Sequence, residues 1–367
     1  MKRIIVFIVL AISVFANFTS TVTYAYSDND FDYENLKTAS GNRAYMDSMM
    51  KFYIQTSPQL QDDLRDGNPV LFLFEGASPN ANIDPNEQRI SASAIIVKCE
   101  NDELKVTAQY DDCSTLPDSP LTAGTDMNKD SVTIYDGEYT IHTTNHRNEY
   151  AALNIQHNGS SRFNGVYLNE DQPRVGNCQG INIHTRRNCD LINIKRSEGC
   201  QLISFQNGNN GDYNDFMFEL TGISNAYDTL LNEEGQYVGS FVVDRYCYRN
   251  QMDALYANVE AVNMITDKSV AAKEEFDETA KVFLDSCSDG LCYPSNKTIT
   301  TLKKTPVHSI PCADNSSVAS YRIATLGPDE EISIVERITN PFGNQFYKVI
   351  LSDGATGYIY YENVMLN

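Results

Sequence analysis

Hydrophobic positions follow three different patterns along this chain of 367 residues. An almost unbroken apolar run extends from Ile4 to Ala16. Apolar residues then recur at helical spacing from Tyr45 to Leu64, and we expect Pro58 to divide that helix in two. From Val70 onward, short apolar runs alternate with segments rich in Gly, Pro, Asn and Asp, which is typical of β-strands. The predicted fold is therefore mainly β with some helix.

The expected strands form two groups. The first group consists of Val70–Phe74, Ala92–Cys99, Leu104–Tyr110, Ser131–Tyr135, Tyr139–Thr143, Ala151–Gln156, Gly180–His184 and Gly239–Asp244. The second group consists of Val318–Ile323, Glu331–Glu336, Phe346–Leu351 and Thr356–Tyr361. Two helices are predicted between the groups, at Gln251–Ile265 and Lys268–Phe283. We therefore predict a helical segment over 26–67, a main domain over 68–266, a helical linker over 267–297 and a small β-barrel over 298–367.

The chain begins with the features of an export signal. Lys2 and Arg3 precede the apolar run, and Thr23-Tyr24-Ala25 offers the small-residue pattern that a signal peptidase needs. We therefore predict a signal peptide over 1–25. Because the apolar run is shorter than the roughly 20 residues that cross a bilayer, no membrane span is predicted. The expected location is outside the cytoplasm, either secreted or periplasmic.

The net charge of −21 limits the classes of partner. Acidic proteins repel the phosphates of nucleic acids, so no nucleic acid partner is expected. The same charge disfavours binding to anionic membranes or wall polymers by simple electrostatics, so any such affinity must come from local pockets. The sequence does not indicate an oligomeric state.

Nine cysteines are an odd number for an oxidising compartment, in which cysteines tend to pair. Short spacings favour the disulfides Cys99–Cys113, Cys178–Cys189 and Cys287–Cys292, with Cys247–Cys312 as the distant pair. Spacing alone does not fix this connectivity. Cys200 is the thiol that the pattern leaves over.

A histidine and this cysteine form the constellation that carries chemistry. His184 closes the expected strand, and Cys200 follows sixteen residues later in Ser197-Glu198-Gly199-Cys200-Gln201. A nucleophilic thiol needs a base within hydrogen-bond reach, and a connection of this length can bring the two side chains together. Gly199 permits a positive φ or a close backbone approach, so amide groups beside Cys200 can face a developing oxyanion.

This order of residues resembles the YkuD-type L,D-transpeptidases, whose pattern is a histidine, an intervening loop and strand, and then Ser/Thr-His-Gly-Cys. The likeness covers roughly residues 68–266, and its specific segments are those of His184 and Cys200. Weaker likenesses are Phe74–Ser78, Cys113–Asp118, Asp136–Thr140, His146 and Tyr150–Asn154. The resemblance implies a β-sandwich catalytic domain. It departs from the family at Glu198, which stands in the place of a histidine, and in the shorter gap before Ser197.

The resemblance implies a role for each matching residue. Cys200 would be the nucleophile and His184 its general base. The carbonyl of Thr185 would orient the imidazole, and the amides of Gly199 and Cys200 would form the oxyanion hole. The sulfur would attack a peptide carbonyl of a peptidoglycan stem peptide, and an amine or water would resolve the thioester. This chemistry needs no metal and no organic cofactor, and it places the protein at the cell wall.

Residues around this constellation are candidates for substrate contact, with a structural role as the alternative for His146. These candidates are His146, Arg186, Arg187, Lys195, Arg196 and Ser197. Basic side chains in an acidic chain can hold the carboxylates of a stem peptide. A solvated loop that balances nearby acids is the alternative for the basic ones. His142 and His146 have no third candidate ligand, so no metal site is predicted.

The end of the chain carries a second likeness. Asp353-Gly354-Ala355-Thr356-Gly357-Tyr358-Ile359 resembles the closing strand of bacterial SH3-like domains, with Tyr358 in the aromatic place. A non-catalytic wall-binding protein that uses this domain is therefore one alternative, and a secreted toxin that hydrolyses a competitor's wall is another.

A different cysteine supports a third alternative. Asp112-Cys113-Ser114 resembles the start of NlpC/P60 cysteine peptidases, whose nucleophile opens a helix. Pro117 and Pro120 follow within one or two turns and disfavour such a helix here.

Overall fold

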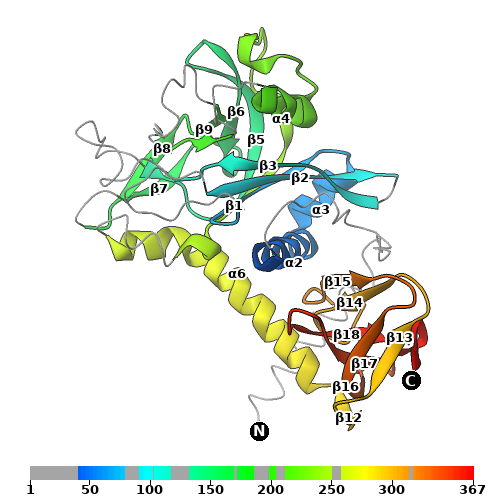
Figure 1. Ribbon diagram of the computed structural model, residues 1–367. Coiled ribbons are helices and arrows are strands. Elements are labelled where there is room, and N and C mark those ends of the chain that lie inside the picture. The colour runs from blue at the N-terminus through cyan, green and yellow to red at the C-terminus, as the bar shows by residue number, and fades with distance from the viewer. Residues whose placement is uncertain are drawn as a thin grey trace. The chain divides into compact units, whose positions relative to one another are not determined.

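Figure 1 shows the computed structural model. It describes residues 40–78, 91–101, 103–116, 132–168, 172–185, 197, 199–203, 211–249, 258–313 and 317–367. They divide into two compact units, the N-terminal unit (residues 40–100 and 104–275) and the C-terminal unit (residues 276–367, with 101–103). The predicted signal peptide, 1–25, lies outside the described residues. In the described part of the chain, no helix is both long and apolar enough to cross a membrane.

Two helices open the N-terminal unit: α2 (Ser40–Thr56) and α3 (Pro58–Arg65). Ser57 caps α3 by accepting a hydrogen bond from the Leu60 amide at 3.3 Å, and Pro58 occupies the first turn, where its missing N–H costs nothing. The helix break predicted at Pro58 is confirmed.

An eight-stranded sheet forms the centre of the unit. Its strands are β1 (Val70–Glu75), β2 (Ala92–Glu100), β3 (Glu103–Cys113), β5 (Gly137–His146), β6 (Tyr150–Gln156), β9 (Asn182–His184), β10 (Gln201–Leu202) and β11 (Tyr237–Asp244). The strand order is β10-β9-β6-β5-β11-β1-β2-β3. β1 runs parallel to β11, and β9 runs parallel to β10.

Strand β1 is buried along its whole length because both faces of the sheet are covered there. On one face, Phe72 and Phe74 contact Tyr53 and Tyr45 of α2. On the other face, Leu71 and Leu73 belong to a core that includes Phe216 and Met217 of α4 (Gly211–Thr221). Figure 1 shows α2 and α3 on one side of β1 and β2. This two-sided burial explains the continuous apolar run in the sequence.

The edges of the large sheet meet at a single point. Ser114, directly after β3, forms an antiparallel bridge with Leu202 of β10. Two backbone hydrogen bonds of 2.9 and 2.8 Å make this bridge. This bridge lies two residues from Cys200. Strand β10 is hydrogen-bonded to β9 on one side and to Ser114 on the other.

A smaller sheet contributes to the same core. It consists of β4 (Val132–Thr133), β7 (Arg162–Tyr167) and β8 (Val175–Gln179), in the order β4-β7-β8. Val132 and Cys178 from this sheet lie in the core that contains Ile141 and Leu153 of the large sheet. Sequence analysis did not predict β7, β8 or α4.

One long helix, α6, stands where two separate helices were predicted, at Gln251–Ile265 and Lys268–Phe283. α6 runs without a break from Val259 to Asp285 and crosses the boundary between the two units, which falls after Glu275. The predicted interruption near residue 266 is wrong. The Thr266 hydroxyl donates to the Val262 carbonyl at 3.0 Å, so this residue is accommodated inside the helix. The predicted start at Gln251 lies outside the described residues.

The C-terminal unit is a sheet of short strands. They are β12 (Ser288–Cys292), β13 (Thr298–Thr301), β14 (Thr305–His308), β15 (Arg322–Leu326), β16 (Glu331–Thr339), β17 (Gln345–Ile350), β18 (Thr356–Tyr360) and β19 (Val364–Leu366). The order is β15-β14-β18-β17-β16-β13-β19, with β12 paired to β16. Residues 318–319 form a turn, so the strand predicted from Val318 begins only at Arg322. The mainly-β prediction is confirmed.

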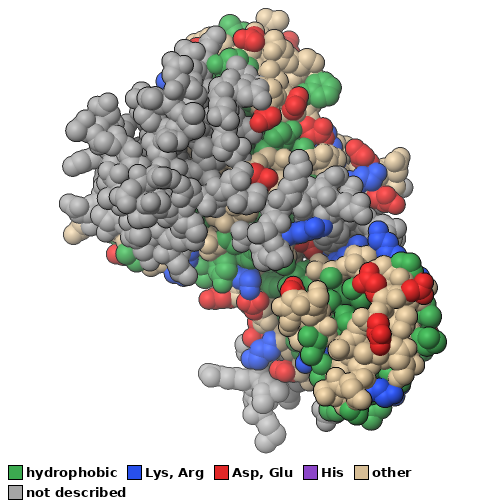
Figure 2. Space-filling view, in the orientation of Figure 1, with side chains coloured by type: hydrophobic (Ala, Val, Ile, Leu, Met, Phe, Trp, Pro, Cys, Tyr) green, Lys and Arg blue, Asp and Glu red, His purple; other side chains and the backbone are tan. Residues whose placement is uncertain are grey.

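Acidic side chains are spread over the face shown in Figure 2 and are mixed with Lys and Arg. The negative charge is therefore a general property of this surface and does not by itself mark a site.

Candidate active site

Sheet register brings the predicted histidine and cysteine onto one face. Leu202 pairs with His184 between β10 and β9, and Asn154 pairs with Asn182 between β6 and β9. Side chains alternate between the faces of a strand, so Asn154, Asn182, His184 and Cys200 share a face. Cys200 directly precedes β10. The two predicted catalytic side chains thus lie on one face of two adjacent parallel strands.

The turn before Cys200 is held by its own side chains. The Ser197 hydroxyl donates to the Cys200 carbonyl at 2.6 Å and accepts the Gly199 amide at 3.2 Å. The fully buried Gln201 donates its side-chain amide to the Gly199 carbonyl at 3.1 Å. Ser197 and Gln201 therefore build the turn, and the Gly199 amide, for which an oxyanion-hole role was predicted, donates to the Ser197 hydroxyl within it.

Gly199 is required by a close backbone approach. Its φ is +129°, and a Cβ placed there would lie 2.3 Å from the carbonyl oxygen of Val132 in the smaller sheet. No other residue type avoids this overlap, because even alanine adds the clashing atom. Gly199 thus lets the turn that carries Cys200 pack directly on strand β4.

The half-buried sulfur of Cys200 points at strand β9. The Asn182 amide lies 3.4 Å from Sγ, and the Gly180 carbonyl oxygen lies 3.9 Å from it. An amide N–H directed at sulfur stabilises negative charge on that atom. We therefore assign this electrostatic role to Asn182, which sequence analysis did not single out.

The buried imidazole of His184 has a defined tautomer. Its Nδ1 lies 2.5 Å from the carbonyl oxygen of Thr185. A carbonyl oxygen only accepts hydrogen bonds, so Nδ1 must carry the proton and Nε2 keeps its lone pair. The hydrogen bond expected of Thr185 is therefore present, and the ring retains a nitrogen able to accept a proton.

Two further aromatic side chains complete the surroundings of His184. The His146 ring stacks on the His184 ring with a centroid separation of 3.8 Å and an interplanar angle of 18°. The Tyr150 hydroxyl donates to the same Thr185 carbonyl and lies 3.3 Å from His184 Nδ1. His146 Nδ1 lies 3.4 Å from the Asn182 side-chain amide. His146 thus contacts the predicted base itself.

Burial keeps both imidazoles neutral. Burial, with a smaller contribution from the neighbouring His146, lowers the pKa of His184 to about 3, although the hydrogen bond to Thr185 opposes the shift. Burial also lowers the pKa of His146 to about 4, with a smaller contribution from Arg147. At neutral pH His146 and His184 are therefore uncharged imidazoles and not imidazolium ions.

Several predicted residues lie outside the described part of the chain. These are Arg186, Arg187, Cys189, Lys195 and Arg196.

Cys113 does not have the setting of an NlpC/P60 nucleophile. It ends strand β3, is fully buried, and donates its thiol to the Tyr110 carbonyl at 3.3 Å. A residue at the end of a strand gains no stabilisation from a helix N-terminus.

The predicted disulfides are not formed among the described cysteines. Cys287 and Cys292 are free thiols at opposite ends of β12, about 16 Å apart at strand rise, whereas a disulfide needs Cα atoms within about 7 Å. Cys99 and Cys113 are not bonded to each other, because they lie at opposite ends of the β2–β3 hairpin. Cys247 and Cys178 are free thiols, which removes the pairs assigned to Cys312 and Cys189.

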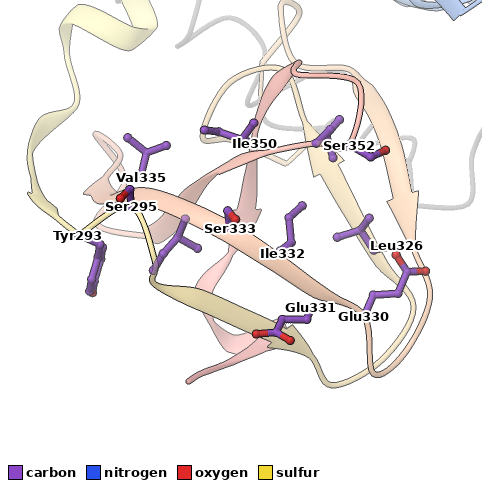
Figure 3. A pocket seen from close by; sticks show the side chains of 12 residues that line it. Tyr293, Ser295, Leu326, Glu330, Glu331, Ile332, Ser333, Val335, Ile350 and Ser352 are labelled. Carbon is purple, nitrogen blue, oxygen red and sulfur yellow. The ribbon is translucent and has the colours of Figure 1, made fainter.

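A concave surface lies in the C-terminal unit (Figure 3). It has a volume of about 640 Å³ and is lined mainly by residues of β16 and its neighbours. Tyr293 lies at one end and the carboxylates of Glu330 and Glu331 at the other. Within the described ranges, no group of three or more His, Cys, Asp or Glu side chains is placed to hold a metal ion.

No family model matches this chain, and no curated protein sequence matches it either. Functional assignment therefore depends on the geometry around Cys200.

Proposed function

We propose that this protein is an exported cysteine enzyme of the L,D-transpeptidase type that modifies peptidoglycan stem peptides through a thioester on Cys200. One observation carries the proposal. Cys200 and His184 share a face of adjacent strands, and the Thr185 carbonyl holds the imidazole with Nε2 unprotonated. The N-terminal unit would be the β-sandwich catalytic domain, and the C-terminal unit would be the SH3-like barrel.

In the proposed reaction, His184 Nε2 accepts the thiol proton as the sulfur attacks the carbonyl carbon of a stem peptide. A carbon–sulfur bond forms, and the carbon–nitrogen bond then breaks as the departing amine takes the proton from His184. An incoming amine gives transpeptidation and water gives carboxypeptidase activity. Either one releases the acyl group and restores the thiol. The neutral imidazole acts as a general base in this scheme, so charge separation develops only during attack.

The groove of the C-terminal unit favours a second candidate, a wall-binding protein without catalysis. It offers an aromatic ring and two carboxylates on a surface of the size used for small ligands. In that case Cys200 would have no elevated reactivity.

Thiol labelling separates the two candidates. Iodoacetamide, followed by peptide mapping of the folded protein, should label Cys200 faster than the exposed Cys292, which serves as an internal reference. His184→Ala should slow labelling of Cys200 about 10-fold or more, in the lower range of general-base contributions, and leave Cys292 unchanged. His142→Ala on strand β5 is the matched control, because that ring contacts Thr140, Gly235 and Tyr237.

A Cys200 that labels no faster than Cys292 in the unaltered protein would rule out the enzyme and leave the binding protein. If labelling succeeds, incubation with purified wall fragments and mass spectrometry distinguishes transfer from hydrolysis. A product with a new cross-link gains the mass of the acceptor amine, whereas hydrolysis adds one water.

A further inference from the structure

One carbonyl group receives two hydrogen bonds beside the predicted base. The Thr185 oxygen accepts from His184 Nδ1 and from the Tyr150 hydroxyl. A carbonyl oxygen has two lone pairs, so these two donors fill its capacity. Tyr150 thus shares the acceptor of His184.

Tyr150 is rigidly placed. It is the first residue of β6, after a tight turn in which Arg147 and Asn148 have φ values of +52° and +55°. Its ring packs against Tyr213, Tyr227 and His146 at centroid separations of 6.0, 5.5 and 5.4 Å, and only 2 % of the residue is exposed. Ring packing on several sides fixes where the hydroxyl points.

The hydroxyl must act as a donor here. Burial raises the pKa of Tyr150 well above its ordinary value, so the group keeps its proton. Since His184 Nδ1 already carries a hydrogen, the Tyr150 proton is directed to the Thr185 oxygen and not to the ring nitrogen. A buried phenol without this partner would lose a hydrogen bond in an apolar setting.

We propose that Tyr150 is a positioning residue that fixes the Thr185 carbonyl and thereby keeps His184 in the Nδ1–H tautomer, with the Nε2 lone pair available on the face that carries Cys200. An effect of Tyr150 on catalysis rests on the proposed function, whereas its effect on the tautomer of His184 does not. The closest matched residue is Tyr213, whose equally buried hydroxyl donates to a backbone carbonyl, that of Ala151, at 2.8 Å.

Tyr150→Phe tests the proposal, with Tyr213→Phe as the control. In protein carrying ¹⁵N-labelled histidine, the ring nitrogens of His184, assigned by their loss in His184→Ala, report the tautomer by NMR. The unaltered protein and Tyr213→Phe should show the Nδ1–H tautomer alone. Tyr150→Phe should show both tautomers of His184. Its Cys200 labelling rate should fall about 3- to 10-fold, and the pH at which this labelling reaches half its maximal rate should shift.

The outcomes are distinct. A Tyr150→Phe protein that keeps the Nδ1–H tautomer alone and an unchanged labelling profile overturns the proposal. An Nε2–H tautomer in the unaltered protein overturns it too, even if Tyr150→Phe does not fold. Failure of the proposed function would instead appear as an unreactive Cys200, with the tautomer of His184 still responding to Tyr150→Phe.

Discussion

The N-terminal unit buries two groups of polar side chains, and they differ in how completely their bonding capacity is used. In the first group, the Arg245 cluster, the guanidinium of Arg245 donates to Asp136, Thr115 and the Ile134 carbonyl and has no exposed surface. Thr115 in turn donates to Glu75 at 2.6 Å. Arg245 and Asp136 thus form a buried ion pair, and the Glu75 carboxylate accepts hydrogen bonds from neutral donors of Ser91 and Thr115.

The second group, the His184 cluster, consists of His146, Tyr150, Asn182, His184 and Cys200. Burial keeps its imidazoles uncharged, and its donors converge on one carbonyl. Nε2 of His184 keeps a lone pair, on the face of the sheet that also carries the half-exposed sulfur of Cys200. A buried ion pair with complete hydrogen bonding suits a structural role in the first cluster, whereas the second cluster keeps the unfilled acceptor that the proposed function requires.

The largest expected effect is on the Arg245 cluster. Arg245→Ala leaves the Asp136 carboxylate buried without its cation and should reduce the free energy of unfolding by about 3 to 5 kcal/mol, measured by urea denaturation. Arg65→Ala removes one partner of an exposed ion pair and should cost less than about 1 kcal/mol. Equal losses in the two variants would mean that the buried pair has no special structural role.

The pH dependence of stability tests Asp244, which directly precedes Arg245 in the chain. Burial, with a smaller contribution from Asp136, raises the pKa of Asp244 from 3.8 to about 7. Between these values the folded protein holds a proton that the unfolded chain has released, so stability falls as pH rises from about 4 to about 8. The difference corresponds to at most about 4 kcal/mol. Asp244→Asn should flatten the pH profile of unfolding, whereas the exposed Asp62→Asn should not.

If the free energy of unfolding of Asp244→Asn depended on pH as in the unaltered protein, the raised pKa of Asp244 would be contradicted. His184 has the opposite sign, because its pKa is lowered and its contribution to stability is lost as pH falls below about 6. Because the two windows overlap between about pH 4 and 6 and their slopes are opposite, the contribution of Asp244 is obtained as the difference between the unaltered protein and Asp244→Asn.

The smallest expected effect on stability comes from the turn that carries Cys200. Gly199→Ala places a Cβ against the Val132 carbonyl and should cost about 2 to 3 kcal/mol. It should also displace the sulfur and slow its labelling. Gly159 also has a positive φ, of +71°, but no atom lies near its Cβ position, so Gly159→Ala should cost only about 1 kcal/mol and leave labelling unchanged. Unaltered labelling in Gly199→Ala would show that contact with Val132 does not position the sulfur.

The sequence predicted the buried strands better than the exposed ones. Val70–Glu75 is covered on both faces and therefore reads as a continuous apolar run. Strands β7 and β8 were missed because they contain polar residues and glycine, such as Asn164 and Gly176, and are largely exposed. The long helix α6 was wrongly divided at Thr266 and Asp267. Threonine and aspartate favour helix ends, but here both lie inside the helix.

The order of His184, Gly199 and Cys200 was enough to predict one part of the candidate site. Tyr150 and Asn182 were not predictable in the same way, because their roles depend on the register between β6 and β9 and on a carbonyl 35 positions further along the chain. A local motif can identify a nucleophile and a base, but not the groups that non-local strand pairing brings to them.

The bridge between Ser114 and Leu202 has a consequence for dynamics. Hydrogen bonds on both sides of β10 mean that its amide protons can exchange with solvent only when the joined sheet opens. The sulfur next to it needs no such opening, since it is half-exposed in the closed state. Slow isotope exchange in the backbone and fast alkylation of the side chain should therefore occur within two residues of each other.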